Sequence, residues 1–365
     1  MKYFKQFIWT ILIGVMVALT YFVFERAVHH SISYIWNDLF NTGQTRLLVI
    51  PLALVLSLIY FGVQHALDPR SENVQSEGLG GVPTPTIKNY LRVLCIGFFS
   101  LIAGASLGPE AILVPACIIV GTYIGTKLIG KQKSVAQEFG ALGFVSLFAA
   151  FFHSFIFGLL ALLLVKRQFK LAITPRLFAL GAIGSVSTYV ALNVLEGKAY
   201  MTLPSYPNHM SLGALLAIVP LFLAGYCSTF VLKFAHDACG QLVTKAKVST
   251  WWQKAFVAAA GLSILYLVGG PLVEFTGNES IAPMFKQAAS LGVAGLIGVF
   301  VVKLLVIAWS KALGYRGGLI FPTLFAASVL AAIAQLAVPD IHIGLAVIVA
   351  FVGFMAADKK AEILL

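Results

Sequence analysis

Two segments rich in glycine and proline could bind an anion without using a charged side chain. The first reads Gly104-Ala-Ser-Leu-Gly-Pro-Glu110 and the second reads Gly314-Tyr-Arg-Gly-Gly-Leu-Ile-Phe-Pro322, each followed by an apolar run. Proline suits the first turn of a helix, and glycine lets the backbone bend and approach a ligand closely. A helix N-terminus has unpaired N–H groups and about half a positive charge. Each segment therefore predicts a helix N-terminus that can bind an anion.

The two segments lie in the two halves of the chain, with Pro109 and Pro322 about 210 residues apart. Apolar sequence flanks the first segment on both sides, so its helix break is expected at membrane depth, where irregular backbone must be buried in protein or line a cavity. Discontinuous helices in corresponding halves are typical of a transporter's substrate site. Ordinary proline-kinked helices, or two loop ends, are the alternative. A third element, Glu77-Gly-Leu-Gly-Gly-Val-Pro-Thr-Pro85, is either a related site or a tight turn.

The composition identifies the surroundings of these segments as a lipid bilayer. Charged residues make up 11% of the 365 residues and apolar residues 59%, whereas a soluble domain has about 25% charged residues. A soluble fold would expose large apolar patches, and disorder needs low hydrophobicity. The net charge of +11 comes from basic clusters between apolar runs, which indicates interfacial anchoring and not nucleic-acid binding. We expect an all-α polytopic membrane protein.

Stretches without Asp, Glu, Lys or Arg mark the expected spans. They are 6–24, 47–67, 93–109, 111–126, 139–165, 177–195, 199–232, 255–273, 287–302, 317–339 and 341–357. A straight membrane helix needs about 20 apolar residues, so several stretches fit one span each. No linker separates soluble domains, and we expect one membrane domain over 1–365, with halves of about 1–196 and 197–365.

Taken together, the three glycine- and proline-rich elements resemble the CLC family of chloride channels and proton-coupled chloride exchangers. That family carries the motifs G-S-G-I-P, G-[KR]-E-G-P and G-x-F-x-P in this order. Leu79-Gly-Gly-Val-Pro83, Ala105-Ser-Leu-Gly-Pro109 and Gly318-Leu-Ile-Phe-Pro322 stand at these places. The resemblance runs from about residue 8 to about 357 and is strongest to a divergent bacterial branch of ion-transport proteins. It implies two inverted helical halves with discontinuous helices, a homodimer, and chloride or a similar small anion as the substrate.

By the same resemblance, the backbone of these motifs would surround a dehydrated anion. The residues implied are Gly80, Gly81, Val82, Pro83, Ser106, Leu107, Gly108, Pro109, Leu319, Ile320, Phe321 and Pro322.

The chain departs from the family pattern at its carboxylates. The gating glutamate, which competes with chloride and carries protons in exchangers, falls on Leu107, and Glu110 lies three positions later. We expect Glu110 to complement the N-terminus of its own helix, with a displaced gate as the alternative. The second proton-carrying glutamate of exchangers would fall near Leu164 and Val165, and Gly80 replaces a serine hydroxyl. These departures favour passive chloride conduction over proton coupling.

Family members continue past the last matched stretch with further helices, one of which supplies a tyrosine ligand, whereas this sequence ends at Leu365. Either the pore is built without that tyrosine or the chain is truncated. We expect passive anion transport in a bacterial cytoplasmic membrane. The rivals are a proton-coupled exchanger or exporter of fluoride or another anion, and a non-transporting membrane partner.

Four other ionisable residues lie within or beside the apolar runs. His153 lies in an uncharged run, where a neutral, hydrogen-bonded histidine is the simplest interpretation and a functional group the alternative. Lys303 either attracts anions near a pore or extends to the membrane interface. Arg316 and Lys311 flank the third motif and could concentrate anions at a pore mouth. The sequence has no motif for catalysis, a metal or a cofactor, and we expect no enzyme activity.

Overall fold

The computed structural model describes residues 2–69, 85–128, 133–202 and 212–363. Its regular elements are helices, and the one β-type pairing among these residues is a single bridge between two loops. Eight of the helices are long and apolar enough to cross a membrane. The expectation of an all-α polytopic membrane protein is therefore confirmed.

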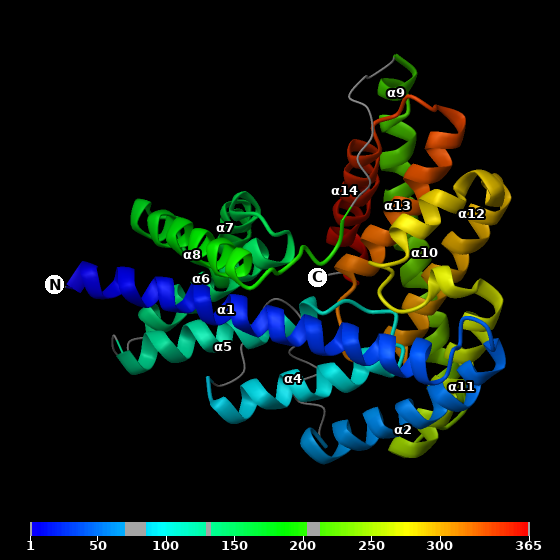
Figure 1. The fold of residues 1–365 in the computed structure, drawn as a ribbon, viewed down its shortest axis with the longest axis horizontal. Helices are drawn as coiled ribbons and strands as arrows, with labels where there is room; N and C mark the ends of the chain where they lie inside the picture. Colours follow the sequence, from blue (N-terminus) through cyan, green and yellow to red (C-terminus); the bar gives the residue numbers. More distant parts are fainter. Residues whose placement is uncertain (1, 70–84, 129–132, 203–211, 364–365) are drawn as a thin grey trace. The chain divides into compact units, whose positions relative to one another are not determined.

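The helices follow one another along the chain as labelled in Figure 1. Their bounds are α1 Lys2–Ile32, a π-helix Ser33–Leu39, a 3-10 helix Arg46–Leu48, α2 Val49–Leu67, α4 Ile87–Ile102, α5 Glu110–Leu128, α6 Lys133–Phe151, α7 Phe155–Phe169, α8 Pro175–Val194, α9 Leu212–Leu216, α10 Ile218–Lys245, α11 Trp251–Gly269, a 3-10 helix Pro271–Val273, α12 Ile281–Ala312, α13 Ile320–Ala337 and α14 Ile343–Ala361.

Several of the expected spans differ from the helices observed, and two of them show why. The uncharged run 139–165 is divided between α6 and α7, because His153 has a left-handed backbone with φ 46° that ends α6. The run 287–302 is part of the longer α12, which contains Lys303 and Lys311 inside its bounds. Uncharged stretches miss such features because a helix can break at an uncharged residue and continue through a charged one.

The described chain forms two compact units. Unit 1 comprises 1–31, 67–98 and 111–201, and unit 2 comprises 32–66, 99–110 and 202–365. Each unit therefore draws on more than one stretch of sequence. The two glycine- and proline-rich loops at 104–110 and 314–322 both belong to unit 2.

In unit 1, α6 packs against α7 and α8. Its approach to α5 depends on glycines, since a Cβ at Gly121 would overlap the carbonyl oxygen of Phe139 and one at Gly143 would overlap that of Cys117. Small residues allow helix backbones to approach closely in a membrane. Thr174 caps α8 by accepting a hydrogen bond of 3.1 Å from the Leu177 N–H. Such a cap satisfies one of the free donors of the first turn.

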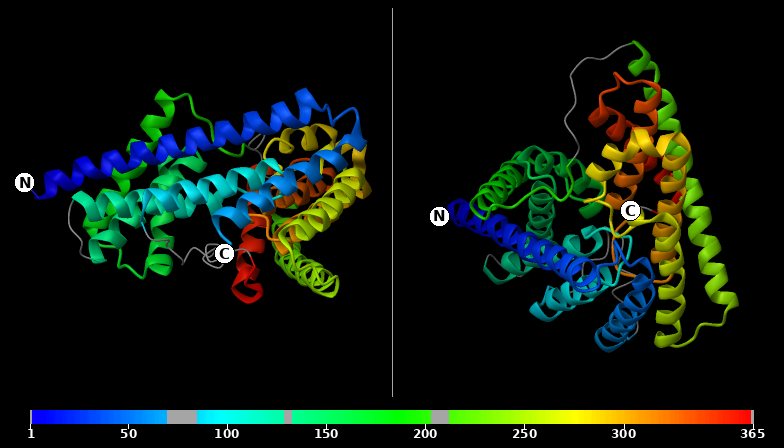
Figure 2. Two further views of the ribbon diagram at one scale, coloured as in Figure 1. Left: turned by 90° about the horizontal axis from the view of Figure 1, so that it is seen from below. Right: turned by 45° about the vertical axis from the view of Figure 1, so that its right-hand side comes forward.

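In unit 2, α12 packs against α10, α11 and α13, and α14 packs against α10 and α13. Figure 2 gives two further views of these helices. The backbone at Gly292 has φ 62° and divides α12 into two helical segments. A Cβ at Gly225 in α10 would overlap the Ala350 carbonyl oxygen of α14, so these two helices also meet through their backbones. This frame positions the N-terminus of α13, where the candidate site lies.

Candidate anion-binding site

The two predicted loops meet as a pair within unit 2. The Gly108 N–H donates to the Gly318 carbonyl and the Gly318 N–H donates to the Gly108 carbonyl, both at 2.8 Å. This antiparallel bridge lies two residues before α5, which begins at Glu110, and two residues before α13, which begins at Ile320. The pairing therefore brings the two helix N-termini together.

The N-terminus of α13 has two N–H groups that its own backbone does not use. Pro322 has no N–H to donate, and the Thr323 N–H donates to the Leu319 carbonyl at 3.1 Å. The N–H groups of Ile320 and Phe321 are left to bind an acceptor outside the helix. Pro322 lies in the first turn of α13, as its sequence context predicted.

The acceptor is the carboxylate of Glu110. Its Oε1 accepts hydrogen bonds from the Ile320 N–H at 2.6 Å and from the Phe321 N–H at 3.4 Å. The side chain is 5% exposed, and its Oε2 is buried without a hydrogen-bond partner among the described residues. We expected this carboxylate to complement the N-terminus of the helix that it begins, and it does interact with the backbone N–H of Glu110 itself, but it also binds the N-terminus of α13. The bridge between the loops explains the difference, because it places the second helix terminus beside the first.

Glycines make room for this carboxylate. A Cβ at Gly108 or at Gly318 would overlap atoms of the Glu110 carboxyl group, whereas a Cβ at Gly317 would overlap the Leu107 side chain and lie 3.0 Å from the Gly108 carbonyl oxygen. Glycine is therefore needed at these three positions because a larger side chain would not fit, and not because the backbone has a positive φ. Leu107, at the place of the family's gating glutamate, is fully buried.

The first loop is held by groups from the second half of the chain. The Ser106 N–H donates to Ser310 Oγ at 3.1 Å, and Ser106 Oγ donates to the Phe275 carbonyl at 2.7 Å. Thr276 Oγ1 donates to the Leu107 carbonyl at 2.7 Å. Sequence reasoning missed Ser310, Phe275 and Thr276, since no motif marks them and they lie 169 to 204 residues from their partners.

The second loop is held by hydroxyl groups. The Arg316 N–H donates to Ser100 Oγ at 2.7 Å, and the Tyr60 hydroxyl donates to the Gly314 carbonyl at 2.8 Å. The Tyr315 ring stacks on Tyr60 with 5.2 Å between centroids. These contacts fix the backbone that leads into α13 before any ligand binds.

The structure thus brings together the predicted residues of the second and third motifs, from Ser106 to Pro109 and from Leu319 to Pro322. The first motif, Gly80, Gly81, Val82 and Pro83, lies outside the described residues. Arg316 is buried and Lys311 is half-buried, and the Lys311 ammonium is close enough to interact electrostatically with the Glu110 carboxylate. Their role as pore-mouth charges stays a prediction.

Lys303 does not extend to a membrane interface. Its side chain is fully buried, and its ammonium donates to the carbonyls of Val273 at 3.2 Å and Phe275 at 2.6 Å. One of the two alternatives weighed for Lys303 is therefore wrong. The reason is that the backbone carbonyls of Val273 and Phe275 bind the amino group inside unit 2.

His153 agrees with the simpler of its two interpretations. In unit 1 its Nε2 lies 3.4 Å from Asn193 Oδ1, and its ring meets Tyr189 edge to face at 5.4 Å. The residue ends α6 and is tied to α8, so its contacts are those of a structural histidine.

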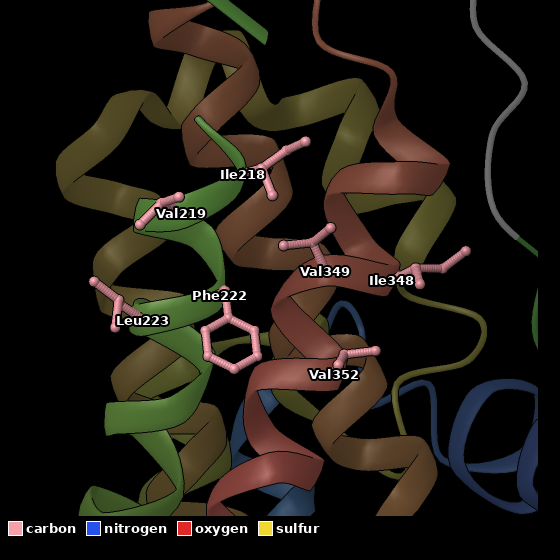
Figure 3. Close-up of a pocket in the computed structure, with 7 residues that line it drawn as sticks. All are labelled: Ile218, Val219, Phe222, Leu223, Ile348, Val349 and Val352. Carbon is pink, nitrogen blue, oxygen red and sulfur yellow. The ribbon is translucent and has the colours of Figure 1, made fainter. Parts of the chain in front are cut away.

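A groove lies between α10 and α14. It encloses about 300 Å³ and is lined by Ile218, Val219, Phe222, Leu223, Ile348, Val349 and Val352, as Figure 3 shows. A dehydrated anion needs hydrogen-bond donors to replace its water, and these side chains have none. The groove is suited to apolar chains and not to the ligand of the helix termini.

Comparisons with known proteins concern the family and the fold of the chain. The sequence model of the family described as "Voltage gated chloride channel" matches residues 77–364. The relative "Putative ion-transport protein YfeO" of Salmonella newport is 28% identical over 258 residues, which is 67% of this chain and 57% of the relative. The protein of the same description from Escherichia coli O127:H6 is 26% identical over 298 residues, or 76% of this chain and 65% of the relative. The chain thus spans less than two thirds of the length of these relatives.

Solved structures share the fold. A slow cyanobacterial Cl−/H+ antiporter has a TM-score of 0.76 and 18% identity, over 97% of this chain and 85% of the other. A CLC-type fluoride/proton antiporter has a TM-score of 0.71 and 12% identity, over 98% of this chain and 87% of the other. At these identities the likeness concerns the fold alone.

Proposed function

Because the chain belongs to the voltage gated chloride channel family, we propose that it moves small anions such as chloride across a membrane. The observation that carries this proposal is the position of the Glu110 carboxylate. It binds two backbone N–H groups at the N-terminus of α13, which is the kind of site that binds free anions in other proteins. A site that binds one anion through backbone donors can bind another when the first one leaves.

Glu110 acts in this proposal as the gate of the site. Its carboxylate is a covalently attached anion that occupies the donors of Ile320 and Phe321, so a free anion can bind them only after the side chain moves. The gating glutamate of the family falls on Leu107, which is buried and has no charge. The gate is therefore supplied by the first residue of α5, three positions further along the chain.

Passive conduction is the preferred mode of transport. The place of the second proton-carrying glutamate of exchangers is taken by Leu164 and Val165, neither of which can hold a proton. The second candidate mode is proton-coupled exchange, which is favoured by one observation: Glu110 is a buried carboxylate at the anion site and could be protonated when it leaves its donors. Both of the solved antiporters described above share this fold.

The setting follows from the same resemblance. We propose a bacterial cytoplasmic membrane as the location, since the relatives named above are bacterial. A homodimer with one anion pathway in each subunit is proposed as the assembly.

Flux measurements on the purified protein test these proposals. Liposomes that contain the protein and a chloride gradient would be followed with a chloride electrode and a pH-sensitive dye. We expect chloride efflux without proton movement, carried at higher affinity by Glu110→Ala than by the natural protein. Proton movement coupled to chloride would establish exchange and overturn the passive mode.

Two outcomes address the function as a whole. Absence of flux for chloride, nitrate and fluoride, with the protein monodisperse and helical, would contradict anion transport and support a non-transporting role. Flux that is the same in the natural protein and Glu110→Ala would leave anion transport standing and reject Glu110 as the gate.

A further inference from the structure

Lys303 has a position that the proposed function does not explain. It lies in α12 with its side chain fully buried, and its ammonium lies 4.9 Å from the centroid of the Phe325 ring. A buried charge is costly unless it is paired and hydrogen-bonded, and ionisable residues inside membrane helices are generally functional. The neighbours of the ammonium indicate what this one does.

The two carbonyls that Lys303 binds belong to the segment 270–277, between α11 and α12. Within it, Gly270, Phe275 and Gly277 all have left-handed backbones, with φ of 71°, 51° and 95°. This conformation is unfavourable for Phe275, which has a side chain. The segment therefore needs external contacts to keep its shape.

A second basic residue, Arg46, also contacts this segment. Arg46 pairs with Glu274 at 2.6 Å and also donates to the Tyr266 carbonyl at 2.6 Å. The Lys303 ammonium interacts electrostatically with the same Glu274 carboxylate. Burial raises the pKa of the Glu274 carboxyl above its ordinary value, while the hydrogen bond and charge of Arg46 oppose that shift.

The segment in turn holds the anion-binding loop. The Phe275 carbonyl accepts hydrogen bonds from both Lys303 Nζ at 2.6 Å and Ser106 Oγ at 2.7 Å. Thr276 binds the Leu107 carbonyl, and the Tyr266 hydroxyl binds the Gly104 carbonyl while it accepts from the Phe275 N–H. One shared carbonyl oxygen thus connects the Lys303 ammonium with the hydroxyl of the loop.

We propose that Lys303 is a positioning residue for the anion site: it fixes the Ser106–Gly108 loop through the Phe275 carbonyl, which both Lys303 and Ser106 bind. The family motif has a basic residue at the place of Ser106, and here a lysine from another helix shares an acceptor with Ser106. This inference rests on the proposed anion transport. Its consequence is that anion affinity depends on a lysine that does not itself touch the anion.

Two substitutions of Lys303 distinguish the effect of its hydrogen bonds from the effect of its amino group. Lys303→Met removes both the charge and the hydrogen bonds, whereas Lys303→Gln removes the charge and keeps an N–H donor. Hydrogen bonds that involve a charged group correspond to an effect of about 10- to 100-fold. We expect the apparent anion affinity in liposome flux to fall by about that factor in Lys303→Met and by less in Lys303→Gln. Lys286→Met, on the exposed face of the same helix, is the matched control and should equal the natural protein.

The readout is the anion concentration for half-maximal flux, which the amount of folded protein does not alter. A purely structural lysine would reduce the yield or thermal stability of the variants and leave that concentration unchanged, which would overturn the proposal. If Lys303→Met does not fold, Lys303→Gln carries the test, and unchanged half-maximal concentration in it has the same meaning.

Combining Lys303→Met or Lys303→Gln with Ser106→Ala tests the shared carbonyl. Since both side chains act through the Phe275 carbonyl, their effects on affinity should be smaller together than the product of the separate effects. Independent effects would reject the connection through Phe275. Absence of flux in the natural protein would instead contradict the proposed function, so the two failures are distinguishable.

Discussion

The two loops that pair at Gly108 and Gly318 have similar compositions but contribute opposite partners to one site. The first loop ends in Glu110 and supplies a carboxylate, whereas the second leads into α13 and supplies two N–H donors. The bridge between them is symmetric, with both hydrogen bonds at 2.8 Å. A pair of helix N-termini therefore need not form two equal anion sites, because one terminus can carry the anion that occupies the other. The predictions below alter this division between the loops, from the largest expected effect to the smallest.

Removing the carboxylate should have the largest effect. In Glu110→Ala the donors of Ile320 and Phe321 lose their attached acceptor, and a free anion no longer competes with it. Because hydrogen bonds to charged groups contribute about 1.5–3 kcal/mol, we expect apparent anion affinity to rise by about 10- to 100-fold. Equilibrium binding of bromide or chloride to the purified protein, followed by calorimetry, measures this.

The control for this substitution is Glu138→Ala. Glu138 forms a partly exposed ion pair with Arg176 in unit 1, and such pairs contribute about 0–1 kcal/mol to stability. Its affinity for anions should equal that of the natural protein. A fall in affinity in Glu110→Ala would show that the carboxylate assists anion binding and does not compete with it.

Crowding the carboxylate should have a smaller effect of the same sign. In Gly318→Ala the new Cβ overlaps the Glu110 carboxyl group, which is the end of a flexible side chain and can swing away. Anion affinity should rise, though by less than in Glu110→Ala, since the displaced carboxylate still lies nearby.

Gly317→Ala provides the contrast for this prediction. Its Cβ meets the Leu107 side chain and the Gly108 backbone, which cannot move aside, and overpacking of this kind costs about 1–3 kcal/mol. We expect a lower melting temperature in detergent without a gain in anion affinity. Equal behaviour of the two alanine variants would mean that the carboxylate does not depend on the space at Gly318.

These loops also show how far sequence reasoning reached. Glycine and proline spacing predicted both helix N-termini, because the requirements of a helix start are local and each residue type reflects them. The composition predicted the membrane fold because every lipid-facing residue must be apolar, whatever its tertiary contacts are, and so adds to the apolar fraction of the sequence. Pro322 lies in the first turn of α13, as predicted, whereas Pro109 lies one residue before α5 begins.

The acceptor of each N–H group could not be predicted. The contact of Glu110 with Ile320 was not predicted, because the two residues lie 210 positions apart in the sequence and only tertiary pairing of the loops brings them together. Lys303 was left between two interpretations because its surroundings, the carbonyls of Val273 and Phe275, carry no sequence signal. Any residue has a carbonyl group, so a contact made through the backbone leaves no mark on residue types.

Removing the hydrogen bond between Ser310 and the first loop should lower the stability of the protein more than its affinity for anions. Ser310→Ala removes the acceptor of the buried Ser106 N–H, at 3.1 Å, and leaves that donor unsatisfied. We expect the free energy of unfolding to fall by about 1–3 kcal/mol, measured by chemical denaturation in detergent. Ser290→Ala on the exposed part of α12, whose hydroxyl binds the Gln287 carbonyl, should change stability by less than about 0.5 kcal/mol. Similar losses in both variants would mean that the loop does not need this bond.

The smallest expected effect concerns the charge outside the pair of loops. Lys311 is half-buried and interacts electrostatically with the Glu110 carboxylate, so Lys311→Met removes a cation near the donors without altering them. Such a charge raises the local concentration of anions, and salt screens it over a Debye length of about 10 Å at 0.1 M. We expect a loss of anion affinity of no more than about threefold at low ionic strength, which disappears in about 1 M of a salt whose anion does not bind. A loss that persists at high salt would mean that Lys311 acts at contact distance. The anion site would then include the end of α12 in addition to the two loops.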